Sequence, residues 1–316
     1  MTDYGHDLLF SANLIPSSEH PDTVVALAEL AEQAGLDLVT FQDHPYQPTF
    51  LDTWTLLSYV AARTSTIRLA GNVHPLPLRP PAMLAQSAAS LDLLSGGRFE
   101  LALGAGGFQD AIAAMGGPRR APGQAVAALE EAIAIIRAVW DPPGEVFFEG
   151  EHYQVTGMRR GPRPAHEIGV WVGGYRPRML ELIGRAADGW LPSLPHLGEL
   201  DALRRGNAVI DEAAERTGRK PSDIRRLLNL GEELPAEQLA EVALVHGTSG
   251  FTLMTMDPGR IRRFGEEVAP AVRELVAKER APDVPRLGLD LFQGGPVIQD
   301  GTTGTEPLTI TERRSP

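Results

Sequence analysis

The first residues with evident chemistry are an aspartate and a histidine that follow one another after an apolar run. Residues 36–41, LDLVTF, are mostly apolar, and FQDHPYQPTF, which begins at the last of them, holds Asp43 and His44. Histidine exchanges a proton near neutral pH, and an adjacent carboxylate raises its pKa or orients its ring. We therefore predict a catalytic role for Asp43 and His44. The alternative is that His44 only hydrogen-bonds a backbone carbonyl.

A second polar group follows the next apolar run, in the segment LAGNVHPLPLRPP. The order Gly-Asn-Val-His favours an unusual backbone geometry, such as a bulge under a planar ligand at Asn72 and Val73. We expect His74 to point into the same opening as His44 and to orient a substrate. Arg79 is open to two interpretations, a contact with a phosphate or an ion pair with a helix carboxylate.

Two glycine-rich turns are candidates for binding a flat, anionic ligand. In LALGAGGFQD, the small residues Gly104, Ala105 and Gly106 leave the backbone open to a ring or a pyrophosphate, although any tight turn has this composition. The second turn, VWVGGYRPRML, leads into a predicted helix. We expect its N–H groups, its arginines and the helix N-terminus to bind an anion, with contributions from Gly173, Gly174, Tyr175, Arg176 and Arg178.

Basic residues also cluster in RRGPR, which contains Arg159, Arg160 and Arg163. In an acidic protein, such a cluster near the cavity mouth favours an anionic ligand tail. A solvated loop explains it equally well.

These residues need elements that bring them together, and the chain alternates short apolar runs with amphipathic stretches. This alternation predicts parallel strands covered by helices. The predicted strands are 8–14, 36–41, 67–73, 98–103, 169–172, 190–194, 224–230 and 251–256, and the predicted helices are 22–34, 51–62, 80–94, 124–140, 177–187, 200–216, 236–245 and 259–276. Eight such units predict an α/β fold of the (β/α)8 TIM-barrel type. An open doubly wound sheet would carry a glycine-rich first turn, whereas this turn reads SANLIPSSEHPD.

We expect one barrel domain over residues 1–316 with two additions. The first is an insertion after the fourth helix, at 141–168, with a hairpin around FFEGEHYQV. The second is a polar C-terminal extension at 283–316. In a barrel, strand ends and the loops that follow them form the functional face, so the motifs above are expected to share one opening.

Composition narrows the range of functions. The net charge of −12 is unlike that of nucleic-acid binders, which carry basic surfaces. Without cysteine there is no thiolate nucleophile or Cys-ligated metal, and Asp43, His44 and His74 are a thin ligand set for a metal hydrolase, so no metal site is predicted. No apolar run spans a bilayer and no secretory signal is evident, which together predict a cytoplasmic protein.

The motifs as a set resemble the luciferase-like monooxygenase superfamily, in the branch of F420-dependent and flavin-dependent oxidoreductases. The resemblance runs through the Asp-His pair, GNVHPLPLRPP, SLDLLSGGRFELALGAG, VWVGG and LIGRAADGWLPS. It implies a cofactor across the C-terminal mouth of the barrel, a non-proline cis peptide at Asn72–Val73, a phosphate at Gly173 and Gly174, and an insertion folded partly over the ligand. Asp43 and His44 match the family's ring-edge and catalytic positions.

The chain departs from this family pattern at two places. Sugar-phosphate dehydrogenases of the family have a glutamate directly after the GxG of the fourth strand, where this chain has Gly107. The nearest acid, Asp110, lies three residues further on, so that activity is not expected. His74 is a titratable residue where many relatives have an apolar or amide side chain.

Three functions follow from the resemblance. The first is hydride transfer between coenzyme F420, a deazaflavin, and a small organic substrate, with the cofactor supplying the redox chemistry. The second is an FMN-dependent monooxygenase that uses reduced flavin and O2 in a dry pocket. The third is a non-catalytic flavin-binding scaffold. A flavin or F420 reductase is the expected partner, along with a homodimer through the second and third helices, as in many relatives.

Overall fold

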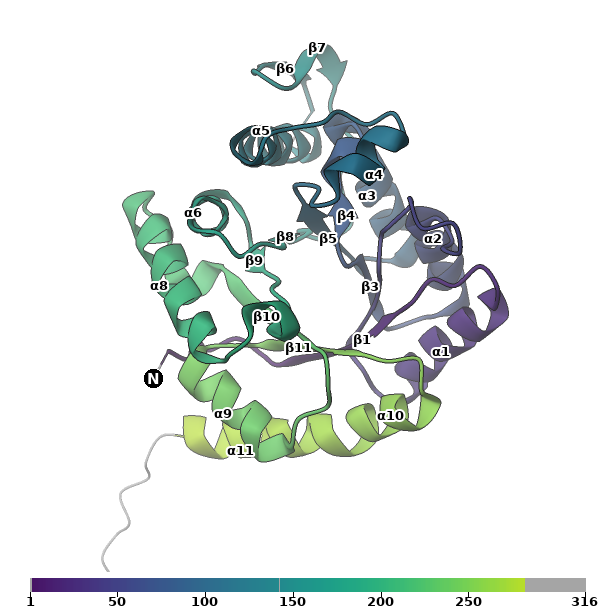
Figure 1. Ribbon diagram of the computed structural model, residues 1–316, viewed down its shortest axis with the longest axis vertical. Coiled ribbons are helices and arrows are strands. Elements are labelled where there is room, and N and C mark those ends of the chain that lie inside the picture. Colours follow the sequence, from purple (N-terminus) through teal and green to yellow (C-terminus); the bar gives the residue numbers. More distant parts are fainter. Residues whose placement is uncertain (1, 142, 282–316) are drawn as a thin grey trace, which may run out of the picture. The chain divides into compact units, whose positions relative to one another are not determined.

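In the computed structural model, which describes residues 2–141 and 143–281, eight parallel strands close into a ring surrounded by helices (Figure 1). The ring strands are β1 (Leu9–Leu14), β2 (Leu38–Phe41), β3 (Arg68–Gly71), β5 (Phe99–Gly104), β8 (Val170–Val172), β9 (Gly189–Trp190), β10 (Arg225–Leu230) and β11 (Gly250–Met254). The main helices are α1 (Pro21–Gln33), α2 (Thr53–Arg63), α3 (Pro81–Ser95), α5 (Pro122–Trp140), α6 (Pro177–Ala186), α8 (Asp201–Arg216), α9 (Ala236–His246), α10 (Pro258–Arg263) and α11 (Ala269–Arg280).

Pairing between neighbouring strands closes the barrel. β11 pairs with β1, with Leu9 opposite Gly250, and β3 pairs with β5, with Leu69 opposite Phe99. All the ring pairings are parallel. The predicted (β/α)8 barrel is therefore confirmed, and the carboxyl ends of the strands meet at one mouth.

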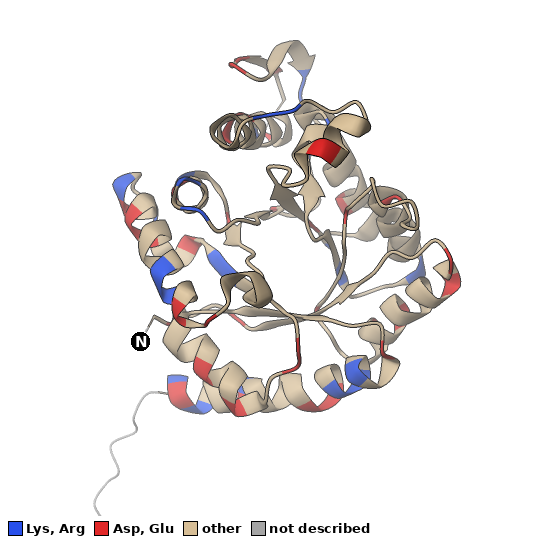
Figure 2. Ribbon diagram, viewed as in Figure 1, with Lys and Arg blue, Asp and Glu red and all other residues tan. Residues whose placement is uncertain are grey.

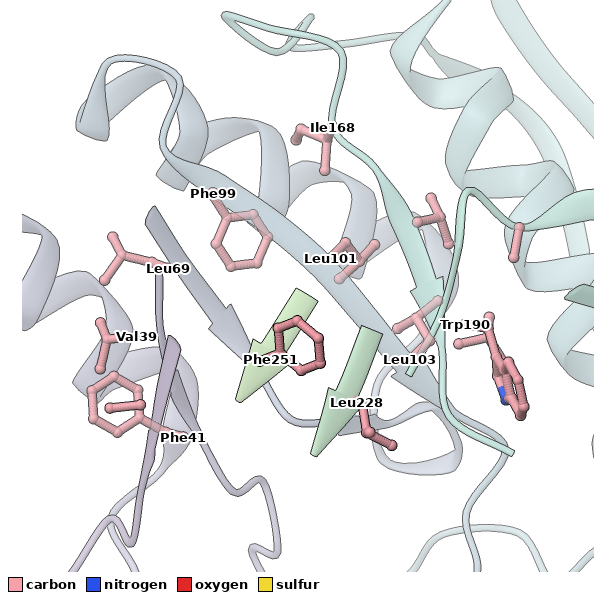
Figure 3. Packing of buried hydrophobic residues seen from close by; sticks show 14 of the residues in the cluster. Val39, Phe41, Leu69, Phe99, Leu101, Leu103, Ile168, Trp190, Leu228 and Phe251 are labelled. Atoms are coloured by element: carbon pink, nitrogen blue, oxygen red, sulfur yellow. The ribbon is translucent and has the colours of Figure 1, made fainter. Parts of the chain in front are cut away.

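The main core lies between the strands and the helices. Phe41, Leu69 and Phe251 are fully buried on the outer face of the ring (Figure 3). Their burial follows from the near-continuous apolar strands of a sheet covered on both faces, and each such side chain contributes about 1.5–3 kcal/mol. Because successive side chains alternate in direction, Ala70 and Ala102 face the other way, into a smaller buried cluster inside the ring.

The third and sixth strands differ most from the prediction. The third strand ends at Gly71, and after the cis peptide bond between Asn72 and Val73 the chain pairs again as β4 (His74–Pro75), beside β5. The sixth strand stops at Trp190, because the chain beyond it, which contains Pro192, turns into the short helix α7 (Leu194–Leu197). A short helix α4 (Gln109–Ala114), the 3-10 turns Leu76–Leu78 and Pro221–Asp223, and the π-helical turn Phe264–Val268 were not predicted.

The predicted hairpin is present in the insertion, as β6 (Glu145–Glu149) paired antiparallel with β7 (Gln154–Arg159). It lies outside α5 rather than over the barrel mouth (Figure 1). Glu131 of α5 binds the turn of the hairpin by accepting hydrogen bonds from the amides of Glu151, His152 and Tyr153. The expected extension at 283–316 lies outside the described residues.

Charged residues lie mostly on the outer helices (Figure 2), where carboxylates and guanidinium groups are solvated. Within residues 2–141 and 143–281, no helix is both long and apolar enough to cross a membrane.

Candidate active site

A cavity of about 870 Å³ opens at the carboxyl ends of the barrel strands. A volume of this size suits a cofactor together with a small substrate. Most of the predicted site residues line it, including Asp43, His44, Asn72 and Val73, the Gly104–Gly106 turn, and the segment from Gly173 to Arg178. The barrel closure brings together these loops, which follow the four strands β2, β3, β5 and β8.

His44 lies at the mouth among aromatic side chains. Its Nδ1 is 2.6 Å from the hydroxyl oxygen of Tyr46, and the ring of Phe108 meets it edge-on with centroids 5.4 Å apart. Burial lowers the pKa of His44, and the negative charge of Asp43 opposes this shift. The same burial raises the pKa of Tyr46 to about 12, so this phenol stays protonated at neutral pH. Of the two effects considered for Asp43 on His44, the carboxylate acts on the pKa of the ring, whereas the hydrogen-bond partner of the ring is Tyr46.

Asp43 is bonded to other partners. Its Oδ2 lies 2.6 Å from Nδ1 of His74 and 3.4 Å from Nη2 of Arg79. The guanidinium of Arg79 also lies 3.0 Å from Asp52, the N-cap residue of α2. Of the two interpretations for Arg79, the ion pair with a helix carboxylate is the one present.

His74 does not face the opening that it was expected to share with His44. Its side chain is 0% exposed, and it is absent from the cavity lining. The ring stacks on Trp54 with centroids 4.6 Å apart and lies behind Asp43. The prediction that His74 contacts the substrate is therefore wrong, because β4 turns its side chain toward α2.

Three uncharged amides, Asn13, Asn72 and Asn229, line the floor of the cavity, and the buried hydroxyl of Thr40 bonds the first two from behind. Asn72 and Asn229 exchange hydrogen bonds, with Nδ2 of Asn72 2.7 Å from Oδ1 of Asn229. Thr40 donates to Oδ1 of Asn13 at 2.9 Å. The predicted non-proline cis peptide bond at Asn72–Val73 is confirmed and lies at the edge of this floor.

Close backbone packing explains the glycines of the turn after β5. A Cβ at Gly104 would lie 2.8 Å from Cγ2 of Val73. Gly106 has a φ of +88°, and a Cβ there would also meet Pro77 and Ile112. This turn thus presents bare backbone to the cavity, as predicted.

The opposite end of the cavity is cationic. Arg176 and Arg178 line it at the start of α6, together with Arg120 from the loop before α5. Within the described chain, these three arginines have no carboxylate within 4.0 Å, and the amides of Gly174 and Tyr175 donate no hydrogen bond. The turn itself is fixed, since Nε1 of Trp190 donates to the carbonyl of Gly174 at 2.9 Å.

Two helix N-termini converge on this end. A Cβ at Gly123, in the first turn of α5, would lie 2.8 Å from Nη1 of Arg178, which places this guanidinium against that turn. A cation at the positive end of a helix dipole is unfavourable. An anion bound between Arg178 and the two helix N-termini would reverse the sign of that interaction.

The basic cluster of the insertion does not reach the cavity. Arg159 and Arg163 are exposed, and Arg160 lies 3.6 Å from Asp141. None of the described residues 143–168 lines the cavity, so the insertion does not fold over the ligand site. The contact between the two regions is indirect, through Arg120, whose guanidinium lies over the ring of Tyr153.

Gly107, the position at which sugar-phosphate dehydrogenases of the resembled family carry a glutamate, has free space around it. A Cβ at Gly107 would meet nothing within 4 Å, and Asp110 is exposed and paired with Arg119 at 2.6 Å. Among the described residues, no group of three His, Asp or Glu side chains is arranged to hold a metal ion.

Several lining residues were missed by the sequence interpretation. Asn13 and Asn229 follow the rule that polar residues at strand ends face the mouth, so strand-end reading could have identified them. Arg120 and Phe108 come from loops and a short helix, and no periodic pattern marks them. Tyr46 lies in FQDHPYQPTF, the same segment as the predicted Asp43 and His44, and its position two residues after His44 was the available signal.

Comparisons with known proteins agree with this geometry. The family model of luciferase-like monooxygenases matches residues 7–231. The F420-dependent glucose-6-phosphate dehydrogenase of Intrasporangium calvum is 32% identical over 211 residues, covering 63% of this chain and 62% of that protein. The F420-dependent hydroxymycolic acid dehydrogenase of Mycobacterium tuberculosis is 30% identical over 235 residues, covering 70% of this chain and 62% of that protein.

The fold also matches solved structures. An F420-dependent secondary alcohol dehydrogenase, solved with an F420-acetone adduct, superimposes with a TM-score of 0.74 and 18% identity, covering 84% of this chain and 99% of that one. At this identity, the likeness shows the fold alone.

Proposed function

The chain belongs to the luciferase-like monooxygenase family and is one of its F420- or flavin-dependent oxidoreductases, and we propose that it transfers a hydride between coenzyme F420 and a small organic substrate. The observation that carries the proposal is the cavity itself. One end has three arginines and two backbone amides that, within the described residues, form no ion pair and donate no backbone hydrogen bond respectively, and the other has His44 among aromatic rings.

The residues present fit a planar ring with an anionic tail. Gly104 and Gly106 leave bare backbone beside Val73 and the cis peptide bond, where a flat ring can lie. Asp43 Oδ1 and Arg120 Nη1 are buried, and neither atom has a hydrogen-bond partner among the described residues. Buried polar atoms without partners are costly, and a ligand in the cavity would satisfy both.

The cationic end favours F420 over FMN. FMN has a single phosphate, which the turn at Gly173 and Gly174 and the α6 N-terminus would hold. F420 has a longer tail with several negative charges. Arg120 and Arg178, beyond the turn and against α5, provide charge for such a tail.

When bound, the deazaflavin supplies a two-electron hydride carrier. The protein holds the ring at the amide floor and moves the accompanying proton at His44. In the tautomer in which Nδ1–H donates to the Tyr46 oxygen, Nε2 presents a lone pair to a substrate hydroxyl. A lowered pKa keeps this imidazole neutral at pH 7, the form that accepts a proton.

The substrate end of the cavity favours a neutral, partly apolar molecule. Phe108 and Tyr46 form an aromatic wall beside His44, with ring centroids 5.4 Å apart. Phe108 is 59% exposed despite its size, which leaves apolar surface free for a substrate. With no glutamate at Gly107, we do not expect a sugar-phosphate substrate.

Anaerobic titration of the purified protein against F420 and FMN tests the proposal. We expect F420 to bind at least tenfold more tightly, and bound F420 to be reduced by secondary alcohols with apolar substituents. Tight FMN binding together with O2 consumption in the presence of a flavin reductase would favour the monooxygenase instead. A protein that binds neither cofactor would contradict both.

A further inference from the structure

We propose that His74 is a positioning residue: with Arg79, it holds one oxygen of Asp43 so that the other oxygen is presented to a ligand in the cavity. The inference rests on the proposed function only for the identity of that ligand. Its basis is the arrangement of the buried wall behind the cavity.

The two oxygens of the Asp43 carboxylate have different surroundings. Oδ2 lies 2.6 Å from Nδ1 of His74 and 3.4 Å from Arg79, whereas Oδ1 has no partner among the described residues. Because an ionised carboxylate only accepts, Nδ1 of His74 carries the proton of this bond. Asp43 is 1% exposed and lines the cavity, so Oδ1 is the oxygen left for an N–H or O–H donor of the ligand.

The imidazole of His74 lies in a buried space bounded by Trp54 and Gly71. Trp54 covers one face, with the two ring planes 16° apart. On β3, a Cβ at Gly71 would lie 2.5 Å from Cε1 of His74 and 2.6 Å from Nε2. The φ of Gly71 is not in the left-handed region, so space for the His74 ring is what requires glycine here.

His74 acts through Asp43 and does not reach the ligand. It is fully buried and absent from the cavity lining, while Asp43 separates it from that space. Packing alone does not explain a histidine in this position. Burying an imidazole against a carboxylate costs free energy, because both groups lose contact with water. An apolar residue of similar volume would fill the same space without that cost.

Three variants test the inference. His74→Leu keeps the volume and removes the donor, whereas His74→Asn retains an N–H close to the place of Nδ1. We expect His74→Leu to weaken cofactor binding about 10- to 100-fold, as the loss of a hydrogen bond to a charged group does, and His74→Asn to stay within about threefold of wild type. Asp43→Asn combined with His74→Leu should bind no more weakly than Asp43→Asn alone.

The control for a general loss of stability is Val60→Ala, a fully buried position on α2 that does not line the cavity. It should lower the Tm without changing the cofactor Kd. Equal cofactor affinity in His74→Leu and wild type would overturn the inference, as would additive effects in the double variant. The proposed function would still stand in that case, because wild-type binding is measured first and separately.

Crystal structures of the two variants give a readout that needs no cofactor. We expect the Asp43 carboxylate to rotate away from the cavity in His74→Leu and to keep its place in His74→Asn. An unmoved Asp43 in His74→Leu would show that His74 does not position it. This comparison holds whichever cofactor the protein binds.

Discussion

At the scale of single residues, burial and a neighbouring charge shift the pKa of His44 in opposite directions. Burial favours the neutral imidazole, and the carboxylate of Asp43 favours the charged one, with burial the larger effect. Asp43 does not bond His44: its Oδ2 lies against His74 and Arg79, and its Oδ1 has no partner among the described residues. We therefore propose separate roles for these two adjacent residues, proton transfer for His44 and ligand binding for Asp43.

The pH dependence of alcohol oxidation tests the role of His44. The rate requires the neutral imidazole, so kcat/KM should fall only at acidic pH, with an inflection below the ordinary histidine value of about 6.5. His44→Ala should lower kcat by about 100- to 10,000-fold and abolish this acid limb. An acid limb that persists in His44→Ala would assign the titration to another group.

At the scale of elements, the N-termini of two helices contribute to the cationic end of the cavity. α5 and α6 both begin at the cavity, and beside their first turns lie arginines that form no ion pair with any described residue. The arrangement adds formal charge to the partial positive charge of two helix N-termini. An anionic tail bound there would satisfy both.

Substituting single arginines distinguishes cavity cations from surface cations. Arg178→Met should weaken F420 binding about 10- to 100-fold, because a charge-assisted hydrogen bond is lost, and should reduce the salt dependence of Kd. Arg163→Met removes the same charge at an exposed position of the insertion and should leave Kd unchanged. Equal effects of the two variants would indicate a general electrostatic attraction in place of a specific site.

The end of the insertion is tied to the barrel by His166. Its Nε2 lies 3.5 Å from Oε1 of Glu100 and its Nδ1 2.8 Å from Oδ1 of Asp92. Glu100 first, and Asp92 after it, raise the pKa of His166 in the folded state. Stabilisation by the charged imidazole is thus complete below the unfolded-state pKa and is lost as the pH rises through the raised folded-state pKa.

Thermal unfolding at two pH values checks the direction of this pH dependence of stability. The Tm of wild type should fall from pH 6 to pH 8 by more than that of His166→Gln, which should be about 1–3 kcal/mol less stable at pH 6. His20→Gln, at an exposed position, serves as the control. A wild-type Tm that rises over the same interval would contradict the assignment.

At the scale of the whole molecule, the closed barrel leaves an apolar surface on two adjacent helices. Tyr59 of α2 is 56% exposed, and Met83 and Leu94 of α3 are 55% and 86% exposed. Exposed apolar residues gathered on neighbouring elements are typical of a protein–protein interface. We therefore propose that the chain forms a homodimer through α2 and α3.

Light scattering measures this directly. Wild type should elute with twice the mass of one chain, and Leu94→Glu should give monomers, because a charge would be buried in the interface. Phe147→Glu, at a 71% exposed position on β6, should leave the mass unchanged. A monomeric wild type would rule out the dimer.

The sequence by itself determined the barrel and the location of the site. Parallel strands alternating with helices have few ways to bury their apolar faces, and the carboxyl ends of such strands meet at one mouth. The motifs that hold Asp43, Asn72, Gly104 and Gly173 could therefore be assigned to a common cavity before any contact was known. The glycine-rich turn that leads into α6 likewise marked the proposed anion site, because backbone amides bind anions whatever the side chains.

Only the tertiary structure decided which side chains share that cavity and which lie behind it. His74 and His44 both follow strand ends, yet His74, on the short strand β4, stacks on Trp54 behind the cavity, while His44 faces the opening. Arg120 reaches the cavity from a loop, whereas Arg159 and Arg163 are exposed and do not line it. Side-chain direction depends on contacts between residues far apart in the chain, and these contacts leave no periodic signal in the sequence.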